Sequence, residues 1–185
     1  MSVVVIPTLE TERLTLRPLE VVDASRLFPI FSNATVLKHY GMEPHATVDE
    51  TVHMVTNMIE GMQAGTVIRW GIVRKDDLTL IGTIGFHNLV PRHRRAEIGY
   101  EIHPDHWRNG YASEALQRAL DYAAHVAAFE RVGAIVYTEN VASQQMLERN
   151  GFFQEGMLRQ YMRQNGRAHD VYMYSYIHER QDHET

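Results

Sequence analysis

The segment IHPDHWRNGYAS, residues 102–113, is the part of the sequence from which the fold is best inferred. Residues 95–103 have the β-rich composition of a strand, and after Trp107 apolar residues recur at helical spacing. We expect the helix to begin near Gly110. The first N–H groups of a helix lack partners and its dipole is positive there, so the segment predicts an anion site, with phosphate as the natural ligand.

Small residues leave the approach to this loop open. Gly110 and Ala112 carry little side-chain bulk, and Arg108 can add a charge-assisted contact to a diphosphate. Packing explains a Gly-x-Ala helix start about as well as a ligand does. The sequence has neither a Gly-x-Gly-x-x-Gly motif nor a P-loop, which disfavours dinucleotides and nucleoside triphosphates.

Polar residues also follow the next predicted strand, residues 132–138. Asn140 and Ser143 lie in the loop and helix start after it. In a strand-helix-strand unit the two strand ends lie side by side. If the strands diverge there, a long thin ligand can pass between them, bonded to open backbone groups of Ile102 and His103 and faced by Asn140 and Ser143.

The remaining patterns predict a mixed α+β fold. Asp23 and the pair Thr47 and Glu50 are expected to cap two helices, while Asn165-Gly166 is typical of a tight hairpin turn. Outside the segment at 95–113, strands are expected at residues 9–19, 67–74, 78–90, 132–138, 161–163 and 167–177, and helices after 23, at 47–65 and at 143–150. The prediction is a largely antiparallel central sheet of six to seven strands flanked by about four helices.

Length and composition fit one soluble domain spanning residues 1–185, with a core at about 9–178. The 185 residues are 44% hydrophobic and 22% charged, without repeats or linkers, and apolar stretches are broken by charge or glycine. The expected location is the cytoplasm, with no membrane insertion. A net charge of −5 argues against a nucleic-acid partner. The 11 His are scattered, so no metal site is expected.

Several motifs occur in a fixed order along nearly the whole chain: ERLTLRPL near residue 12, IGTIGF, AEIGYEI, WRNGYASEA, TENVASQQMLERNGF, EG and the closing NG hairpin. In this order they resemble the GNAT superfamily of acetyltransferases, in its branch of ribosomal-protein N-terminal acetyltransferases. Each motif alone is modest, but their combination is highly specific. The resemblance implies a GNAT-like fold with the sheet splayed between its fourth and fifth strands.

The resemblance also implies acetyl-coenzyme A as co-substrate. Its pantetheine arm would lie against Ile102, His103 and Pro104, and near Asn140 and Ser143. The residues implied at its diphosphate are Arg108, Asn109, Gly110, Tyr111, Ala112 and Ser113. The chain departs from the family at Trp107, where Gln or Arg is common three positions before the first glycine.

Acetyl transfer to an amine needs a neutral nucleophile and a proton for the departing thiolate. The chain has no Cys, which favours direct attack on the thioester in a ternary complex. By the resemblance, Glu97 is the candidate base and Ser143 the candidate acid. Glu97 could instead be a structural partner for Arg13, Arg17 or Arg95, and Ser143 could also cap its helix.

The amine acceptor is less well defined by the sequence. Candidate lining residues are Tyr40, Trp70, His87, Tyr161 and Asp170, of which we expect at most two to touch substrate, because most such aromatics are core. Asp170 could instead pair with an Arg across the hairpin. The acceptor is a protein N-terminal α-amine or a small molecule such as an antibiotic, polyamine or amino acid. A non-catalytic acyl-coenzyme A sensor is the alternative, and a homodimer is compatible with the sequence.

Overall fold

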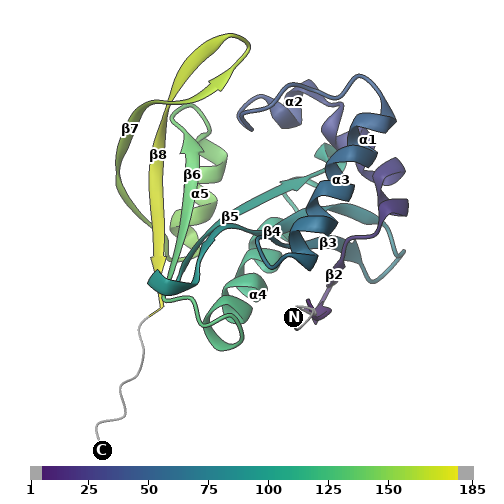
Figure 1. The fold of residues 1–185 in the computed structure, drawn as a ribbon, viewed down its shortest axis with the longest axis horizontal. Coiled ribbons are helices and arrows are strands. Elements are labelled where there is room, and N and C mark those ends of the chain that lie inside the picture. Colours follow the sequence, from purple (N-terminus) through teal and green to yellow (C-terminus); the bar gives the residue numbers. More distant parts are fainter. Residues whose placement is uncertain (1–5, 179–185) are drawn as a thin grey trace, which may run out of the picture.

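A computed structural model describes residues 6–178. Its central feature is one eight-stranded sheet in the order β1-β2-β3-β4-β5-β6-β8-β7, with α1 to α3 on one face and α4 and α5 on the other (Figure 1). The strands are β1 Leu9–Glu10, β2 Leu14–Pro18, β3 Ile68–Arg74, β4 Leu80–Val90, β5 Arg95–Ile102, β6 Arg131–Tyr137, β7 Phe153–Gln164 and β8 Arg167–Ile177. The helices are α1 Ala24–Phe31, α2 Ala34–Leu37, α3 Val48–Gln63, α4 Tyr111–His125 and α5 Val141–Arg149.

The predicted mixed fold with a largely antiparallel sheet is confirmed, while the predicted numbers of strands and helices were too low. The single strand expected at residues 9–19 is two strands, because a turn intervenes in which the Thr11 hydroxyl accepts a hydrogen bond from the Leu14 N–H at 2.9 Å. The short helix α2 was not expected. Asn33 begins it by accepting hydrogen bonds from the N–H groups of Thr35 and Val36.

Two helix caps differ from the prediction. The Asp23 carboxylate does not cap α1; it pairs with the Arg17 guanidinium at 2.7 Å and accepts the Glu20 N–H. Thr47 precedes α3 as expected, but its side chain makes no capping hydrogen bond among residues 6–178, and Glu50 instead accepts the N–H of Ala46. Both helices nevertheless form, since their apolar faces pack on the sheet.

The pairing of the strands changes from antiparallel to parallel between β5 and β6. Strands β1 to β5 are joined by antiparallel pairings, whereas β5 and β6 are parallel and pair at only three positions, the last being Glu97 with Gly133. Beyond these residues the strands separate, as Figure 1 shows. This is the separation predicted between the fourth and fifth strands. These two strands are β5 and β6 in the structure, because the first predicted strand is divided into β1 and β2.

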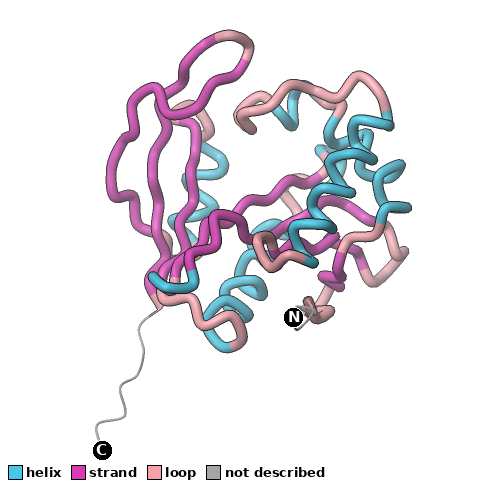
Figure 2. The backbone as a smooth tube through the Cα atoms, viewed as in Figure 1, coloured by secondary structure: helices cyan, strands magenta, loops and turns pink. Residues whose placement is uncertain are grey.

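The third part of the sheet is the long hairpin β7–β8. It turns at Asn165 and Gly166, both with positive φ (52° and 71°), as expected for this pair. Strand β7 is much longer than the predicted residues 161–163, because irregular pairing near Gly156 and before Met162 obscures its alternation. In Figure 2 the hairpin tip and the α2–α3 connection, residues 38–47, face each other at the same end of the molecule.

Candidate functional site

The divergence of β5 and β6 creates the first element of the site. After Glu97, β5 continues to Ile102 without a strand partner on its β6 side within the described residues. Strand β6 likewise continues from Gly133 to Tyr137 and pairs there only with β8. A strand edge without a partner presents backbone donors and acceptors.

The end of β5 is more occupied than the sequence suggested. The Ile102 carbonyl accepts the Trp107 indole N–H at 2.7 Å, and the His103 N–H donates to the Ile81 carbonyl at 2.8 Å. The expectation of open groups at Ile102 and His103 was therefore wrong for these two atoms, because the loop folds Trp107 back over the strand end. Pro104 then begins a short 3-10 turn. The edge without a strand partner lies earlier, at residues 98–101.

The predicted anion loop ends at the N-terminus of α4. Gly110 precedes the helix with a φ of 78°, a conformation that favours glycine, and Arg108 has a φ of 62°. Within the described residues, no side chain caps α4. The N–H groups of the first turn, which begins at Tyr111 and includes Ala112 and Ser113, thus remain available as donors. Arg108 and Asn109 are exposed beside them.

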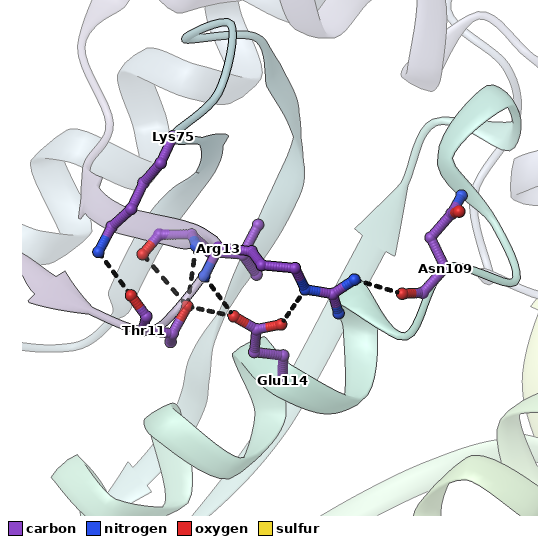
Figure 3. A network of polar contacts seen from close by, with 6 residues as sticks. Thr11, Arg13, Lys75, Asn109 and Glu114 are labelled. Carbon is purple, nitrogen blue, oxygen red and sulfur yellow. Dashed lines mark hydrogen bonds and ion pairs between the residues drawn. The ribbon is translucent and has the colours of Figure 1, made fainter.

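Arg13 supports this loop from the turn between β1 and β2 (Figure 3). Its guanidinium donates to the Asn109 carbonyl at 2.9 Å, pairs with Glu114 at 2.7 Å and lies 4.6 Å from the centre of the Tyr111 ring. Glu114 also accepts the Thr11 hydroxyl at 2.6 Å. From the sequence, Arg13 was expected only as a possible partner of Glu97. The ERLTLRPL motif was the available signal, but it does not show which residue Arg13 contacts.

The start of α5 lies beside β5. The Asn140 side chain caps the helix by accepting the Ser143 N–H at 3.3 Å, so Asn140 rather than Ser143 is the N-cap. The Ser143 hydroxyl instead lies 2.6 Å from the Tyr100 hydroxyl. Burial raises the pKa of Tyr100 to about 12. In addition, Ser113 bonds to the side chain of Asn150 at the end of α5, which fixes the two helices relative to each other.

Glu97 occupies the point where β5 and β6 part, on the opposite face of β5 from Tyr100. Its carboxylate accepts a hydrogen bond from the Asn88 amide at 3.1 Å and lies 3.7 Å from His87 Nε2. The pKa of His87 is lowered by burial and by the charge of Arg69. Arg13 and Arg17, considered as its structural partners, pair with other carboxylates.

A buried ion pair lies on the same face as Glu97. Arg69 and Glu101 pair at 2.6 Å, with 6% and 4% of their surfaces exposed. The Tyr40 hydroxyl donates to Glu101 at 2.5 Å, and burial raises its pKa far above the usual value. Arg69 also donates to the Gly99 carbonyl at 3.0 Å. Tyr40 thus ties the α2–α3 connection to β5, rather than presenting a free hydroxyl to a substrate.

The other proposed acceptor residues are spread over the molecule. Trp70 was wrongly included, because it is completely buried and packs against Phe86 and Tyr122. Tyr161 is exposed near the hairpin tip. Asp170 accepts the Gln160 N–H at 2.7 Å and pairs with no Arg among residues 6–178. Of the five candidates, only His87 and Tyr40 lie near Glu97 or the buried pair beside it.

An open groove of about 790 Å³ runs along α3, lined by Met42, His45, Asp49, Glu50, His53, Met54, Asn57, Met58 and Val67. Among residues 6–178, no cluster of three or more His, Asp or Glu side chains is placed to hold a metal. No helix in this part of the chain is long and apolar enough to cross a membrane.

Comparisons with known proteins agree with this architecture. The N-acetyltransferase YoaA of Bacillus subtilis (strain 168), itself uncharacterized, is 46% identical over 175 residues, covering 95% of this chain and 99% of the relative. The ribosomal-protein-serine acetyltransferase of Escherichia coli (strain K12) is 34% identical over 115 residues, 62% of this chain and 63% of that protein.

A solved structure shows the same fold. The crystal structure of spermidine N-acetyltransferase from Vibrio cholerae in complex with CoA and spermine superposes with a TM-score of 0.80 at 26% identity, covering 90% of this chain and 96% of that one. The sequence profile of an acetyltransferase (GNAT) domain matches residues 13–153. The chain therefore belongs to the GNAT family of acetyltransferases, which confirms the resemblance seen in its sequence.

Proposed function

We propose that this acetyltransferase transfers the acetyl group of acetyl-coenzyme A to a primary amine, by direct attack within a ternary complex in the cytoplasm. The observation that carries the proposal is the separation of β5 and β6 after Glu97 and Gly133. By side-chain alternation, Tyr100 with Ser143 beside it lies on one face of β5, and Glu97 with His87 beside it lies on the other. The two substrates could thus meet between the strands from opposite faces.

The residues present fit the coenzyme. The edge of β5 without a strand partner at residues 98–101 offers backbone hydrogen bonds to a pantetheine arm, and Asn140 and Ser143 border it from α5. The N-terminus of α4 has no side-chain cap within residues 6–178 and offers N–H donors to a diphosphate. Arg108 is exposed beside it and can add a positive charge. When bound, the coenzyme would supply the acetyl thioester.

The chain's own residues would handle two protons. A carbon–nitrogen bond forms as the amine attacks the thioester carbonyl, and the carbon–sulfur bond breaks. Glu97, directly or through one water, would accept the proton that the amine loses. The Ser143 hydroxyl would donate a proton to the departing thiolate and regain one through solvent, while Glu97 releases the proton it took from the amine. Holding both substrates in line would supply much of the rate.

A protein N-terminal α-amine is our first candidate acceptor, supported by the similarity to the ribosomal-protein-serine acetyltransferase. A small amine is the second candidate, supported by the structural similarity to the spermidine enzyme. The fold does not discriminate between them. The acceptor must be identified from the site itself or by assay.

The test is isothermal titration with acetyl-coenzyme A, followed by a thiol-release assay over a panel of amines. The panel contains peptides with free α-amines, spermidine, an aminoglycoside and free amino acids. We expect binding and release with at least one amine, and Ser143→Ala should retain binding while losing most of the release. Binding of acetyl-coenzyme A without release on any amine would identify a sensor and contradict the proposal.

A further inference from the structure

Tyr137, the last residue of β6, has a buried hydroxyl without a hydrogen-bond partner among residues 6–178. The side chain as a whole is buried, with 3% of the residue exposed. Buried polar groups are nearly always hydrogen-bonded, because removing them from water without compensation is unfavourable. An unpaired hydroxyl at the end of a diverging strand is thus a donor that a bound ligand would satisfy.

Tyr137 lies on the acceptor side of the site. Side chains alternate along a strand, so Tyr137 shares its face of β6 with Gly133. A Cβ placed on Gly133 would lie 3.3 Å from Glu97 Cγ. Tyr137 and the candidate base are consequently on the same face of the sheet, with Tyr137 nearer the open ends of the strands.

The surroundings of the hydroxyl come from two other segments. The His39 ring lies 5.7 Å and the His169 ring 5.2 Å from the Tyr137 ring, centre to centre. A Cβ at Gly41 would lie 3.5 Å from the hydroxyl oxygen. These residues belong to the α2–α3 connection and to β8, so the hydroxyl lies where the two halves of the molecule meet above the separated strands.

The charges nearby restrict the chemistry of the ligand. Burial, together with the carboxylates of Glu139 and Glu43, raises the pKa of Tyr137, so the hydroxyl keeps its proton and can donate it. The same carboxylates disfavour an anion. A neutral carbonyl oxygen is the acceptor that satisfies the hydroxyl without adding negative charge.

We propose that the Tyr137 hydroxyl donates a hydrogen bond to a backbone carbonyl oxygen of a peptide acceptor, and that Tyr137 is a specificity-determining residue. This rests on the proposed acetyl transfer and selects the peptide α-amine over a polyamine, which has no carbonyl. The unpaired hydroxyl lowers the stability of the free protein, and the bound peptide would remove that deficit.

The experiment compares the wild type with Tyr137→Phe, which removes only the hydroxyl. The two acceptors are a short peptide amide with a free α-amine and spermidine, both assayed at saturating acetyl-coenzyme A. The variant should raise KM for the peptide about 5-fold, the effect of one neutral hydrogen bond, and leave KM for spermidine unchanged. The variant should also melt at the same temperature as the wild type or higher.

Tyr174→Phe is the matched control. Tyr174 is completely buried, but its hydroxyl contacts Glu148 and Gln154, each at 3.0 Å. Its removal should lower the melting temperature and leave both KM values unchanged. A melting temperature of Tyr137→Phe that falls as far as that of Tyr174→Phe would show that the Tyr137 hydroxyl already has a partner, and would overturn the inference.

The kinetic outcomes separate the two proposals. Equal KM values for the peptide with wild type and Tyr137→Phe, or a wild type that acetylates spermidine but no peptide, would refute the role of Tyr137 and leave acetyl transfer standing. A wild type that binds acetyl-coenzyme A and acetylates neither amine would refute both.

Discussion

The hydroxyl oxygens of Tyr100 and Ser143 lie 2.6 Å apart and connect β5 to the first turn of α5, beyond the last residue at which β5 pairs with β6. The raised pKa of Tyr100, about 12, keeps its phenol protonated at neutral pH because the ring is buried. With Tyr100 as the donor, the proton of Ser143 is free to point elsewhere. This arrangement suits Ser143 to protonate a leaving thiolate between the strands.

Replacing Ser143 with Ala should lower kcat about 100-fold, the usual contribution of a positioned general acid. The helix should survive, because Asn140 caps it through the backbone N–H of residue 143. Tyr100→Phe should lower kcat less, about 5-fold, because it removes only the hydrogen bond that orients Ser143. Steady-state kinetics with the best amine of the panel, together with the Kd of acetyl-coenzyme A, measure both effects.

Ser25→Ala is the control for this pair, since Ser25 is exposed at the start of α1 and its hydroxyl donates to the Val22 carbonyl. It should leave kcat unchanged. If Ser143→Ala retained full kcat, the role of general acid would have to move to a water molecule or another side chain.

Arg13 should determine how tightly the coenzyme is held. Arg13→Ala removes the hydrogen bond to the Asn109 carbonyl and the contact with the Tyr111 ring. Because Arg13 is partly exposed, we expect a loss near 1 kcal/mol, which raises the Kd of acetyl-coenzyme A about 5-fold with little change in kcat. Isothermal titration measures the first quantity and initial rates the second.

Arg118→Ala is a matched control on the same helix. Arg118 pairs with Asp121 at 2.6 Å, away from the loop at the start of α4. It should leave the Kd unchanged. An equal rise in Kd for both variants would mean that the loss of positive charge, rather than support of the loop, is responsible.

The local parts of this site could be predicted from the sequence, because a strand end, a glycine turn and a helix start are adjacent in the chain. The contact between Arg13 and Glu114 joins residues 101 positions apart, and no periodic pattern encodes it. Trp70 was wrongly predicted to line the acceptor site for a related reason. Residues Ile68 to Val73 of β3 are buried on both faces, so alternation cannot separate a core aromatic from a site aromatic.

Glu97→Gln should flatten the rise of kcat/KM with pH, because an amide cannot accept the amine's proton. At the alkaline plateau the wild type should be about 100-fold faster than the variant, if Glu97 acts as the base. Rates from pH 6 to 9 with unchanged binding of acetyl-coenzyme A measure this. Glu12→Gln, an exposed carboxylate in the β1–β2 turn, is the control. A variant with the wild-type pH profile would leave Glu97 a structural role only.

Three half-buried histidines should make the fold less stable in weak acid. Burial is the largest of the effects that lower the pKa of His39, His87 and His106 below 6.5. The unfolded chain therefore binds more protons near pH 6 than the folded chain does. The free energy of unfolding should be constant above about pH 7 and should fall as the pH drops below 6.5.

Urea titrations at pH 7.5, 6.0 and 5.0 test this expectation. His87→Asn should reduce the dependence on pH, whereas His93→Asn, at an exposed turn, should leave it as in the wild type. A free energy of unfolding that increases as the pH is lowered from 7.5 to 5.0 would show that folding raises the pKa of these histidines instead of lowering it.

Gln164 holds the hairpin tip against the α2–α3 connection. Its amide is buried, donates to the carbonyls of Leu37 at 2.7 Å and Met42 at 2.9 Å, and accepts the Gly41 N–H at 3.3 Å. These bonds join two segments 122 to 127 residues apart beside the Tyr137 hydroxyl. The contact therefore holds together the two segments that border the proposed acceptor position.

Gln164→Ala removes the amide hydrogen bonds to both carbonyls, although the Leu37 carbonyl keeps the Tyr40 N–H at 3.1 Å, so the hairpin tip should open and admit water to them. We expect a loss of about 1–3 kcal/mol in the free energy of unfolding and faster hydrogen exchange in residues 38–47. KM for the amine should rise, while the Kd of acetyl-coenzyme A should not, because the coenzyme loop lies at α4. Gln145→Ala, on the exposed side of α5, should change none of these quantities. If exchange accelerated equally at α4 and at residues 38–47, the effect would be general destabilisation, and Gln164 would have no specific role in holding the acceptor side together.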